Sequence, residues 1–203
     1  MRAEAGGWNG LVLRSLDSLG SQRLKETTGA TFPFWSYDGT AIGFFADGRL
    51  KVIDLASLTI RALCPAPDPG GGTWGADDII LFLPERSSRY QTVKGAGGAC
   101  ATLELRGLSG DIARPFFFAD GRHFLATTNR KIILGEIGVD SLAPIADIAF
   151  GTALPVAADY ILYQPPGTPS GTYLAQRVDF TARKMVGTAT KVAADVPGRL
   201  GYT

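Results

Sequence analysis

The chain contains few side chains for His-based metal sites or catalytic triads. Its 203 residues include one histidine, His123, and two cysteines. A serine hydrolase needs its serine on a strained turn such as Gly-x-Ser-x-Gly, with a histidine in reach, and no such pentapeptide occurs. His123 follows an Asp-Gly turn and opens an expected strand, so we interpret it as a surface or strand-packing residue. The sequence therefore predicts no catalytic residue and no metal site.

Two glycine-rich stretches, 69–74 and 94–100, invite comparison with phosphate-binding loops. The dinucleotide fingerprint needs glycine at its first, third and sixth positions. Gly95 and Gly97 match the first two, but Cys100 stands at the sixth, and neither stretch is followed by the Lys-Ser/Thr pair of a P-loop. We interpret both stretches as loops between repeat units and predict no cofactor.

The two cysteines, Cys64 and Cys100, lie 36 residues apart in apolar surroundings. They do not show the Cys-x-x-Cys redox spacing, and two thiols do not make a zinc site. Free cysteine is among the most buried residue types, so we expect two buried, reduced thiols. A disulfide between them is the alternative.

Charge and hydropathy exclude several classes of partner. Lysine and arginine total 20 against 19 aspartates and glutamates, and no basic block could neutralise a row of phosphates. Nucleic acid is therefore not an expected partner. The sequence shows no export signal and no window of about 18 apolar residues. We expect a soluble chain without membrane insertion, whose compartment the sequence leaves open.

A repeat with a period near 40 residues organises the chain. Its marker is a turn aspartate, at positions 38, 77, 120 and 159, so the steps are 39, 43 and 39 residues. Turn chemistry explains aspartate at such positions without a catalytic role. Three residues before each turn stands an aromatic or apolar residue: Trp35, Trp74, Phe117 and Val156. We expect the three aromatic residues, Trp35, Trp74 and Phe117, to pack between neighbouring units.

Within a unit, apolar runs of four to six residues alternate with Gly, Asp, Asn and Pro, which is typical of short strands joined by tight turns. The clearest unit predicts strands over 32–35, 41–45, 50–55 and 59–63. Four antiparallel strands in about 40 residues are the signature of a β-propeller blade. The predicted fold class is therefore an all-β propeller.

The units divide the chain into a single propeller domain over 1–203. They are a half blade at 9–28, whole blades at 31–67, 70–106, 113–148 and 152–193, and a further half blade at 195–203. The two halves could form one shared blade, which would give about five blades and close the ring. Equally, the chain could be a partial propeller cut from a longer one.

These motifs resemble the TolB-like, WD-repeat-related propeller domains found C-terminal to bacterial Ser/Thr protein kinases. A unit of that family typically reads as an aromatic residue, Ser, Pro, Asp, Gly and then an apolar strand, and residues 31–55, 114–125 and 160–180 are the stretches most similar to it. Tyr37 stands where the family usually has proline, and Asp77-Asp78 lacks the glycine, which predicts other turn types there. The resemblance implies a propeller that binds partners or ligands and has no catalytic residues. It is also compatible with an extracytoplasmic location. The kinase motifs themselves are absent from this sequence.

The leading functional prediction is a non-catalytic binding module that presents a loop-lined face to a protein or small ligand. Aromatic and arginine side chains near loops are favoured at binding surfaces, so we predict contacts through Tyr37, Trp74 and Arg114 on one face. One alternative is a propeller hydrolase or lyase with acids lining its central channel. Another is a partial propeller that associates with itself through open blade edges.

Overall fold

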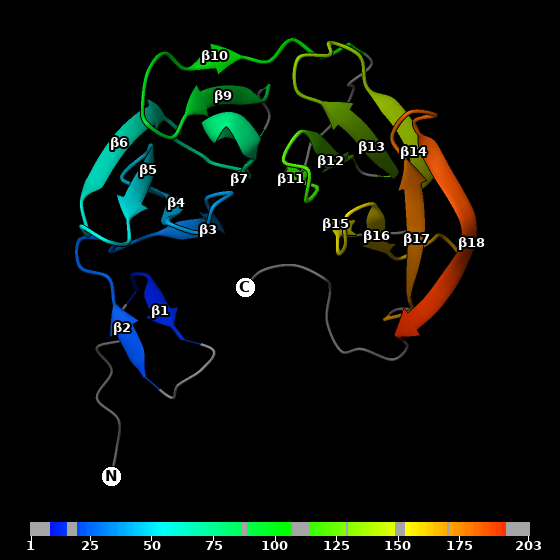
Figure 1. Ribbon diagram of the computed structural model, residues 1–203, viewed down its shortest axis with the longest axis horizontal. Helices are drawn as coiled ribbons and strands as arrows, with labels where there is room; N and C mark the ends of the chain where they lie inside the picture. Colours follow the sequence, from blue (N-terminus) through cyan, green and yellow to red (C-terminus); the bar gives the residue numbers. More distant parts are fainter. Residues whose placement is uncertain are drawn as a thin grey trace.

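The computed structural model describes residues 9–15, 20–86, 89–106, 114–128, 130–148, 153–169 and 171–193. These residues form four antiparallel sheets of four strands and one two-stranded hairpin. The sheets follow one another in an arc about a common centre, with the hairpin and the last sheet at its two ends (Figure 1). The chain is an all-β propeller, as the sequence predicted. Within the described ranges, no helix is long and apolar enough to cross a membrane.

The strands follow chain order within each sheet. The hairpin consists of β1 (Val12–Arg14) and β2 (Ser21–Arg23). Blade 1 consists of β3 (Thr31–Trp35), β4 (Ala41–Ala46), β5 (Arg49–Asp54) and β6 (Ile60–Pro65). Blade 2 consists of β7 (Gly71–Trp74), the 3-10 turn η1 (Ala76–Asp78), β8 (Ile79–Leu83), β9 (Gln91–Lys94) and β10 (Ala101–Thr102). Blade 3 consists of β11 (Phe116–Phe117), β12 (His123–Thr127), β13 (Lys131–Glu136) and β14 (Ala143–Asp147). Blade 4 consists of β15 (Leu154–Pro155), β16 (Tyr160–Tyr163), β17 (Tyr173–Asp179) and β18 (Lys184–Ala193).

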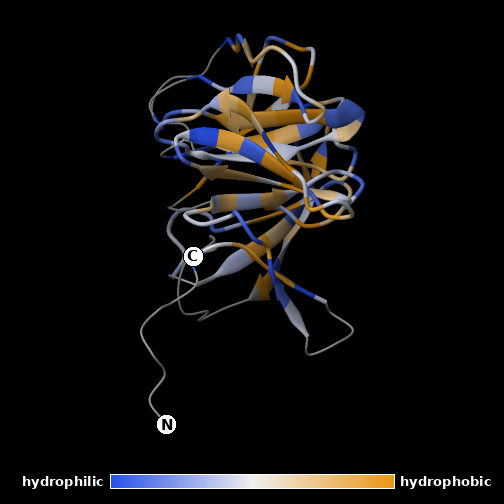
Figure 2. Cartoon of the chain, turned by 90° about the vertical axis from the view of Figure 1, so that its left-hand side faces the viewer, coloured by the Kyte–Doolittle hydropathy of each residue, from blue (hydrophilic) through white to orange (hydrophobic). Residues whose placement is uncertain are grey.

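The second strand of each blade carries the core. Side chains of a strand alternate between its two faces, so a strand between two neighbouring sheets must be apolar throughout. In β8, Ile80 and Phe82 pack towards blade 1, whereas Leu81 and Leu83 pack towards blade 3. Apolar strands consequently stack through the molecule, while polar residues are frequent at the turns (Figure 2). The apolar runs seen in the sequence thus form the packed interfaces, here called seams, between adjacent blades.

The turn residues explain how such short strands reverse direction. Asp47 and Gly48 both have positive φ, 53° and 69°, as a two-residue hairpin between right-twisted strands requires. Asp77 and Asp78, which lack the glycine, also have positive φ, at 54° and 59°, and lie in the 3-10 turn η1. The different turn type predicted for this pair is therefore present.

The prediction of two reduced thiols is wrong. Cys64 and Cys100 form a disulfide with their Cα atoms 6.0 Å apart. Cys64 lies near the end of β6 inside the seam between blades 1 and 2, and Cys100 packs against the same apolar cluster. The apolar surroundings that suggested buried thiols are therefore the shared interior of two adjacent blades, where the two sulfurs meet.

The packing role predicted for Trp35, Trp74 and Phe117 holds for two of the three. Trp74 is 8% exposed in the seam between blades 1 and 2, and Phe117 packs into the seam between blades 2 and 3. Trp35 is instead 54% exposed. It belongs to the first blade of the arc and points away from blade 2, so the prediction is wrong for Trp35. The half blade predicted at 195–203 lies outside the described residues, and the unit boundaries and ring closure stay predictions.

Breaking the disulfide will destabilise the contact between blades 1 and 2. The cross-link closes a loop across a sequence separation of 36 residues. It lowers the conformational entropy of the unfolded chain and so raises the free energy of unfolding by about 3–4 kcal/mol. We expect the Cys64→Ser/Cys100→Ser double variant to melt at a lower temperature in calorimetry, and reductant to lower the melting temperature of the parent chain only. Equal melting of the two chains without reductant would contradict a structural role.

Candidate functional site

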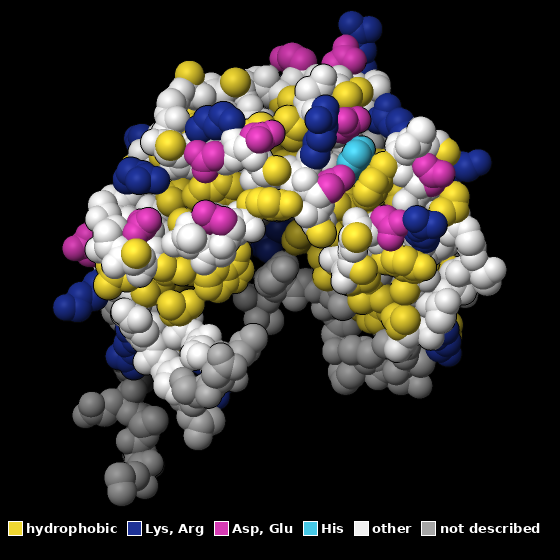
Figure 3. Space-filling view, in the orientation of Figure 1, with side chains coloured by type: hydrophobic (Ala, Val, Ile, Leu, Met, Phe, Trp, Pro, Cys, Tyr) yellow, Lys and Arg dark blue, Asp and Glu magenta, His cyan; other side chains and the backbone are white. Residues whose placement is uncertain are grey.

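The turns between the first and second strands of the blades lie together on one face, which we call the turn face. They comprise residues 36–40, 75–78, 118–122 and 156–159. The Tyr37 hydroxyl donates to the Ala119 carbonyl at 3.0 Å, and the Ala76 N–H donates to the Gly121 carbonyl at 2.9 Å. These bonds connect the turns of blades 1, 2 and 3. Figure 3 shows side chains of both charges on this face, with the single histidine between acidic groups.

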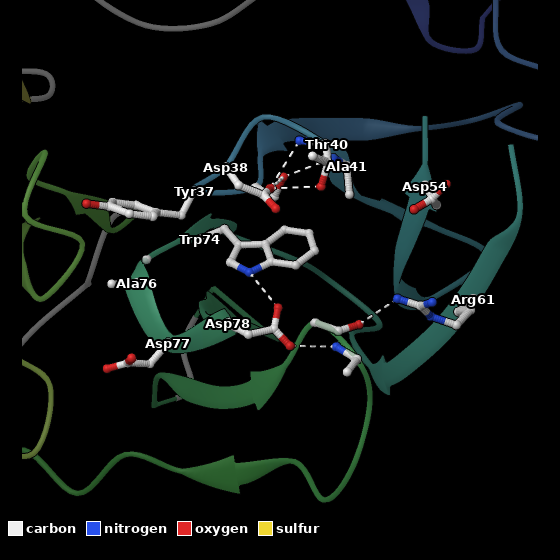
Figure 4. A pocket seen from close by; sticks show the side chains of 14 residues that line it. Tyr37, Asp38, Thr40, Ala41, Asp54, Arg61, Trp74, Ala76, Asp77 and Asp78 are labelled. Carbon is white, nitrogen blue, oxygen red and sulfur yellow. Dashed lines mark hydrogen bonds between the residues drawn. The ribbon is translucent and has the colours of Figure 1, made fainter. Parts of the chain in front are cut away.

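A hollow of about 300 Å³ opens on the turn face between blades 1 and 2. We call it hollow A. Blade 1 lines it with residues 36–38 and 40–41, with Asp54 at the end of β5 and with Arg61 near the start of β6. Blade 2 lines it with residues 74–78 and 95–96. Figure 4 shows the Trp74 indole at its centre, Asp54 and Arg61 on one side, and Tyr37 and Asp77 on the other. The site is therefore built from the loops of two blades that the disulfide also joins.

The blade 2 side of hollow A is held rigidly by Asp78. The Trp74 Nε1 donates to the Asp78 Oδ1 at 3.1 Å, and the Ala96 N–H donates to the Asp78 Oδ2 at 2.8 Å. Arg61 of blade 1 reaches across and donates to the Gly95 carbonyl at 3.0 Å. One carboxylate thus fixes an aromatic ring and a loop, and one arginine ties that loop to the neighbouring blade.

Two carboxylates on the blade 1 side are ionised and oriented by their own turns. Asp38 accepts from the Ser36 hydroxyl at 2.7 Å and from both the N–H and the hydroxyl of Thr40, and these bonds hold its pKa below the usual value. Asp54 accepts from the N–H and hydroxyl of Ser57, at 2.7 and 2.8 Å, which lowers its pKa in the same way. In both cases these bonds go to Oδ1. Within the described part of the chain, no hydrogen bond reaches either Oδ2.

Hollow A is consequently an acidic site with aromatic walls. Four carboxylates, those of Asp38, Asp54, Asp77 and Asp78, line it together with the single guanidinium of Arg61. Its formal charge is negative although the whole chain carries +1. An aromatic and carboxylate lining favours a cationic group over an anionic one.

A second hollow, hollow B, of about 680 Å³, lies at the equivalent place between blades 3 and 4. Asp159 pairs there with Arg177 at 2.5 Å, while Asp120 contacts His123 Nδ1 at 2.5 Å. The His123 ring stacks on Phe180 of blade 4 with centroids 4.2 Å apart. The interpretation of His123 as a packing residue is therefore confirmed. The acidic groups of hollow B are more fully paired than those of hollow A, which makes hollow A the stronger candidate.

The structure brings together two of the three predicted contact residues. Tyr37 and Trp74 both line hollow A. Arg114 lies at the opposite end of the inner strands, where its guanidinium sits 4.4 Å from the centre of the Phe32 ring and its side chain packs against Gly71. The prediction that all three share one face is wrong for Arg114. Arg114 precedes the inner strand β11, whereas Trp74 ends β7 and Tyr37 lies in the turn after β3.

Asp54 and Arg61 are site residues that the sequence reasoning missed. A signal for Asp54 was present, because an acidic residue ends the third strand in blades 1, 3 and 4: Asp54, Glu136 and Asp179. No comparable signal marks Arg61, whose role depends on the position of the neighbouring blade. Among the described residues, no group of three or more His, Cys, Asp or Glu side chains could hold a metal ion.

Comparison with known proteins supports the fold alone. No protein-family model and no curated protein matches the chain. TolB from Acinetobacter baumannii is similar in structure, with a TM-score of 0.65 and 14% identity over 92% of this chain and 49% of that one. Virginiamycin B lyase from Staphylococcus aureus (TM-score 0.61, 15% identity, 94% of this chain and 64% of that one) is similar as well. So is the β-propeller domain of Swd1 from Myceliophteria thermophila (TM-score 0.60, 15% identity, 93% and 66%).

The chain is thus a β-propeller that spans between about half and two thirds of the length of these structures. They include a lyase beside TolB and Swd1, so the shared fold does not by itself decide between catalysis and binding. The kinase context suggested by the sequence resemblance stays a prediction.

Substituting Gly95 will distort hollow A. A Cβ at this position would lie 1.9 Å from the Trp74 ring and 2.5 Å from the Asp78 Oδ1, so the indole and its carboxylate partner must move. We expect Gly95→Ala to lower stability by about 1–3 kcal/mol, as overpacking does, in denaturant unfolding. Ala96→Ser, at the exposed neighbouring position, is the matched control and should unfold like the parent chain.

Acid will remove the stabilisation that the turn carboxylates provide. The folded-state pKa values of Asp38 and Asp54 lie below their ordinary 3.8, so their contribution is complete above that pH and is lost as pH falls through the lower folded values. We expect Asp38→Asn to melt below the parent chain at neutral pH and the difference to shrink towards about pH 2. A difference that is constant with pH would show that the ionised carboxylate is not responsible.

Proposed function

We propose that this propeller is a binding module whose hollow A receives a cationic group, such as a lysine or arginine side chain, from a protein partner. The observation that carries the proposal is the pair of carboxylates, Asp38 and Asp54, whose Oδ1 atoms are fully engaged in turns. Their Oδ2 atoms remain available at hollow A, which the Trp74 and Tyr37 rings also line. Charge-assisted hydrogen bonds to such preoriented oxygens are stronger than hydrogen bonds between neutral groups.

The same carboxylates are poorly suited to general acid catalysis. A carboxylic acid that protonates a leaving group near neutral pH needs a raised pKa, which burial among apolar groups provides. Here the turn hydrogen bonds lower the pKa of Asp38 and of Asp54. Asp120 in hollow B is partly buried, yet hydrogen bonds from Arg122 and His123 outweigh that burial and lower its pKa as well. These properties support binding over the hydrolase or lyase alternative.

The disulfide supports a location where thiols are oxidised. Cys64 is fully buried, so a reductant would have to open the seam between blades 1 and 2 to reach it. Disulfides of this kind persist in secreted and periplasmic proteins and are rare in the cytosol. We therefore propose that the module binds its partner in an extracytoplasmic compartment.

The binding proposal is tested with short peptides that differ only in charge. We expect peptides with two or three Lys or Arg residues to bind in calorimetric titration, to weaken with added salt, and to lose about fivefold in affinity against Asp54→Asn, as one partly exposed ion pair predicts. Asp147→Asn is the matched control, since Asp147 is exposed at the end of an outer strand.

Two outcomes would overturn the proposal. Equal binding of acidic and basic peptides would show that the carboxylates of hollow A do not select the ligand. Turnover of a glycoside or ester that disappears in Asp54→Asn but not in Asp147→Asn would instead establish the enzymatic alternative.

A further inference from the structure

The four blades share two equivalent positions on the turn face, which we call the paired positions. One lies directly before the second strand of the blade, and the other lies in the third strand, opposite the first residue of the second. In every blade the residue after the latter position donates its N–H to the carbonyl of the former, at 2.7 to 3.1 Å. From blade 1 to blade 4 the pairs are Thr40 and Asp54, Asp78 and Lys94, Arg122 and Glu136, and Asp159 and Arg177. Blades 2, 3 and 4 each place one acid and one base there, whereas blade 1 has an acid and a neutral threonine.

Blades 3 and 4 show what the two charges do at these positions. The Arg122 Nε donates to the Glu136 Oε1 at 2.9 Å. The Arg177 Nε donates to the Asp159 Oδ2 at 2.5 Å. The base of blade 2 is Lys94, and its ammonium donates to a backbone carbonyl instead. Arginine is thus the residue that pairs with a carboxylate at the paired positions.

Asp54 has the acid of such a pair without its base. In the part of the chain that the structure describes, neither Asp54 nor Asp38 forms an ion pair with lysine or arginine. Arg61 lines the same hollow, but its guanidinium donates to the Gly95 carbonyl of blade 2 (Figure 4). The hydrogen bonds that Asp54 accepts from its own turn all go to Oδ1. Its Oδ2 is therefore left to a donor from outside the chain.

Two features of hollow A suit a guanidinium better than an ammonium. The Leu55 N–H donates to the Thr40 carbonyl at 3.0 Å, so the turns that hold Asp38 and Asp54 are adjacent and both carboxylates line one hollow. A guanidinium presents five N–H donors in a planar fork and can serve two acceptors, whereas an ammonium is a compact and strongly hydrated charge. The hollow also has aromatic walls, on which a planar guanidinium stacks.

We propose that the group bound by hollow A is a guanidinium, namely an arginine side chain of a protein partner, which completes the paired positions of blade 1 as Arg122 completes those of blade 3. The inference rests on the proposed function and narrows it from cations in general to arginine. The partner's guanidinium donates to the Asp54 Oδ2, as Arg122 donates to Glu136, and its remaining N–H groups are directed towards Asp38.

Three peptides that differ at three positions only, with arginine, lysine or citrulline, test this inference on the full chain. Citrulline has nearly the shape of arginine but carries no charge. We expect calorimetric titration to give about tenfold tighter binding of the arginine peptide than of the lysine peptide. The citrulline peptide should bind at least tenfold more weakly than the lysine peptide, because it lacks the charge that the carboxylates select.

A substitution can supply the base that blade 1 lacks. Thr40 is exposed, and Thr40→Arg places a guanidinium at the position that Arg122 holds in blade 3. We expect Thr40→Arg to weaken binding of the arginine peptide about tenfold, because the new side chain occupies Asp54. Thr40→Gln is the matched control, since it removes the same hydroxyl without adding charge, and it should weaken binding less than threefold.

Melting temperatures show whether the new arginine pairs as proposed. Thr40→Arg should melt about 1–2 °C above Thr40→Gln, as an exposed ion pair predicts. The difference should disappear when Asp54→Asn is added to both variants, because the pair needs the Asp54 carboxylate. A difference that persists with Asp54→Asn would contradict the pairing.

The remaining outcomes separate this inference from the proposed function. Equal affinity for the arginine and lysine peptides, with no binding of the citrulline peptide, would overturn the inference and leave the proposed function intact. Equal affinity for all three peptides would overturn both. Binding of acetylarginine amide as tightly as the arginine peptide would replace the protein partner with a small guanidinium compound.

Discussion

The structure depends on the burial of each blade's second strand on both faces. Because side chains alternate along a strand, β8 sends Ile80 and Phe82 to blade 1 and Leu81 and Leu83 to blade 3. Each sheet is therefore complete only when a neighbour covers each of its faces. This requirement sets the order of the blades and places the disulfide inside a seam. It also accounts for the exposed apolar residues at the ends of the arc, where no described blade lies opposite.

The same arrangement places the loops for binding. The turn after each inner strand is short and lies next to the turns of the neighbouring blades. Hydrogen bonds from Tyr37 to Ala119 and from Ala76 to Gly121 connect the turns of blades 1, 2 and 3. Hollow A forms where the turns of two blades meet, with ionised carboxylates on one side and a fixed indole on the other. A rigid frame with charged turns suits recognition, since its groups are oriented before the partner arrives.

Part of the candidate site could be predicted from the sequence. Tyr37 and Trp74 lie at or beside a turn that recurs about every 40 residues. Because equivalent turns of neighbouring blades lie together, the repeat predicts that these two residues are close in space. Arg61 could not be predicted, because its partner, the Gly95 carbonyl, belongs to another blade and is brought close only by packing. Arg114 was assigned to the wrong face because it lies before the inner strand of its blade, whereas Trp74 ends its inner strand and Tyr37 follows one.

The sequence alone determined the fold class, since a 40-residue period of turn aspartates and apolar runs permits few arrangements other than propeller blades. It also determined the chemistry of the turns, because hydrogen bonds within three residues fix Asp38 and Asp54. Only the tertiary structure decided that Cys64 meets Cys100 and that Trp35 is exposed whereas Trp74 is buried. The reason is that local bonds depend on neighbours in sequence, whereas burial and cross-links depend on which blade lies opposite.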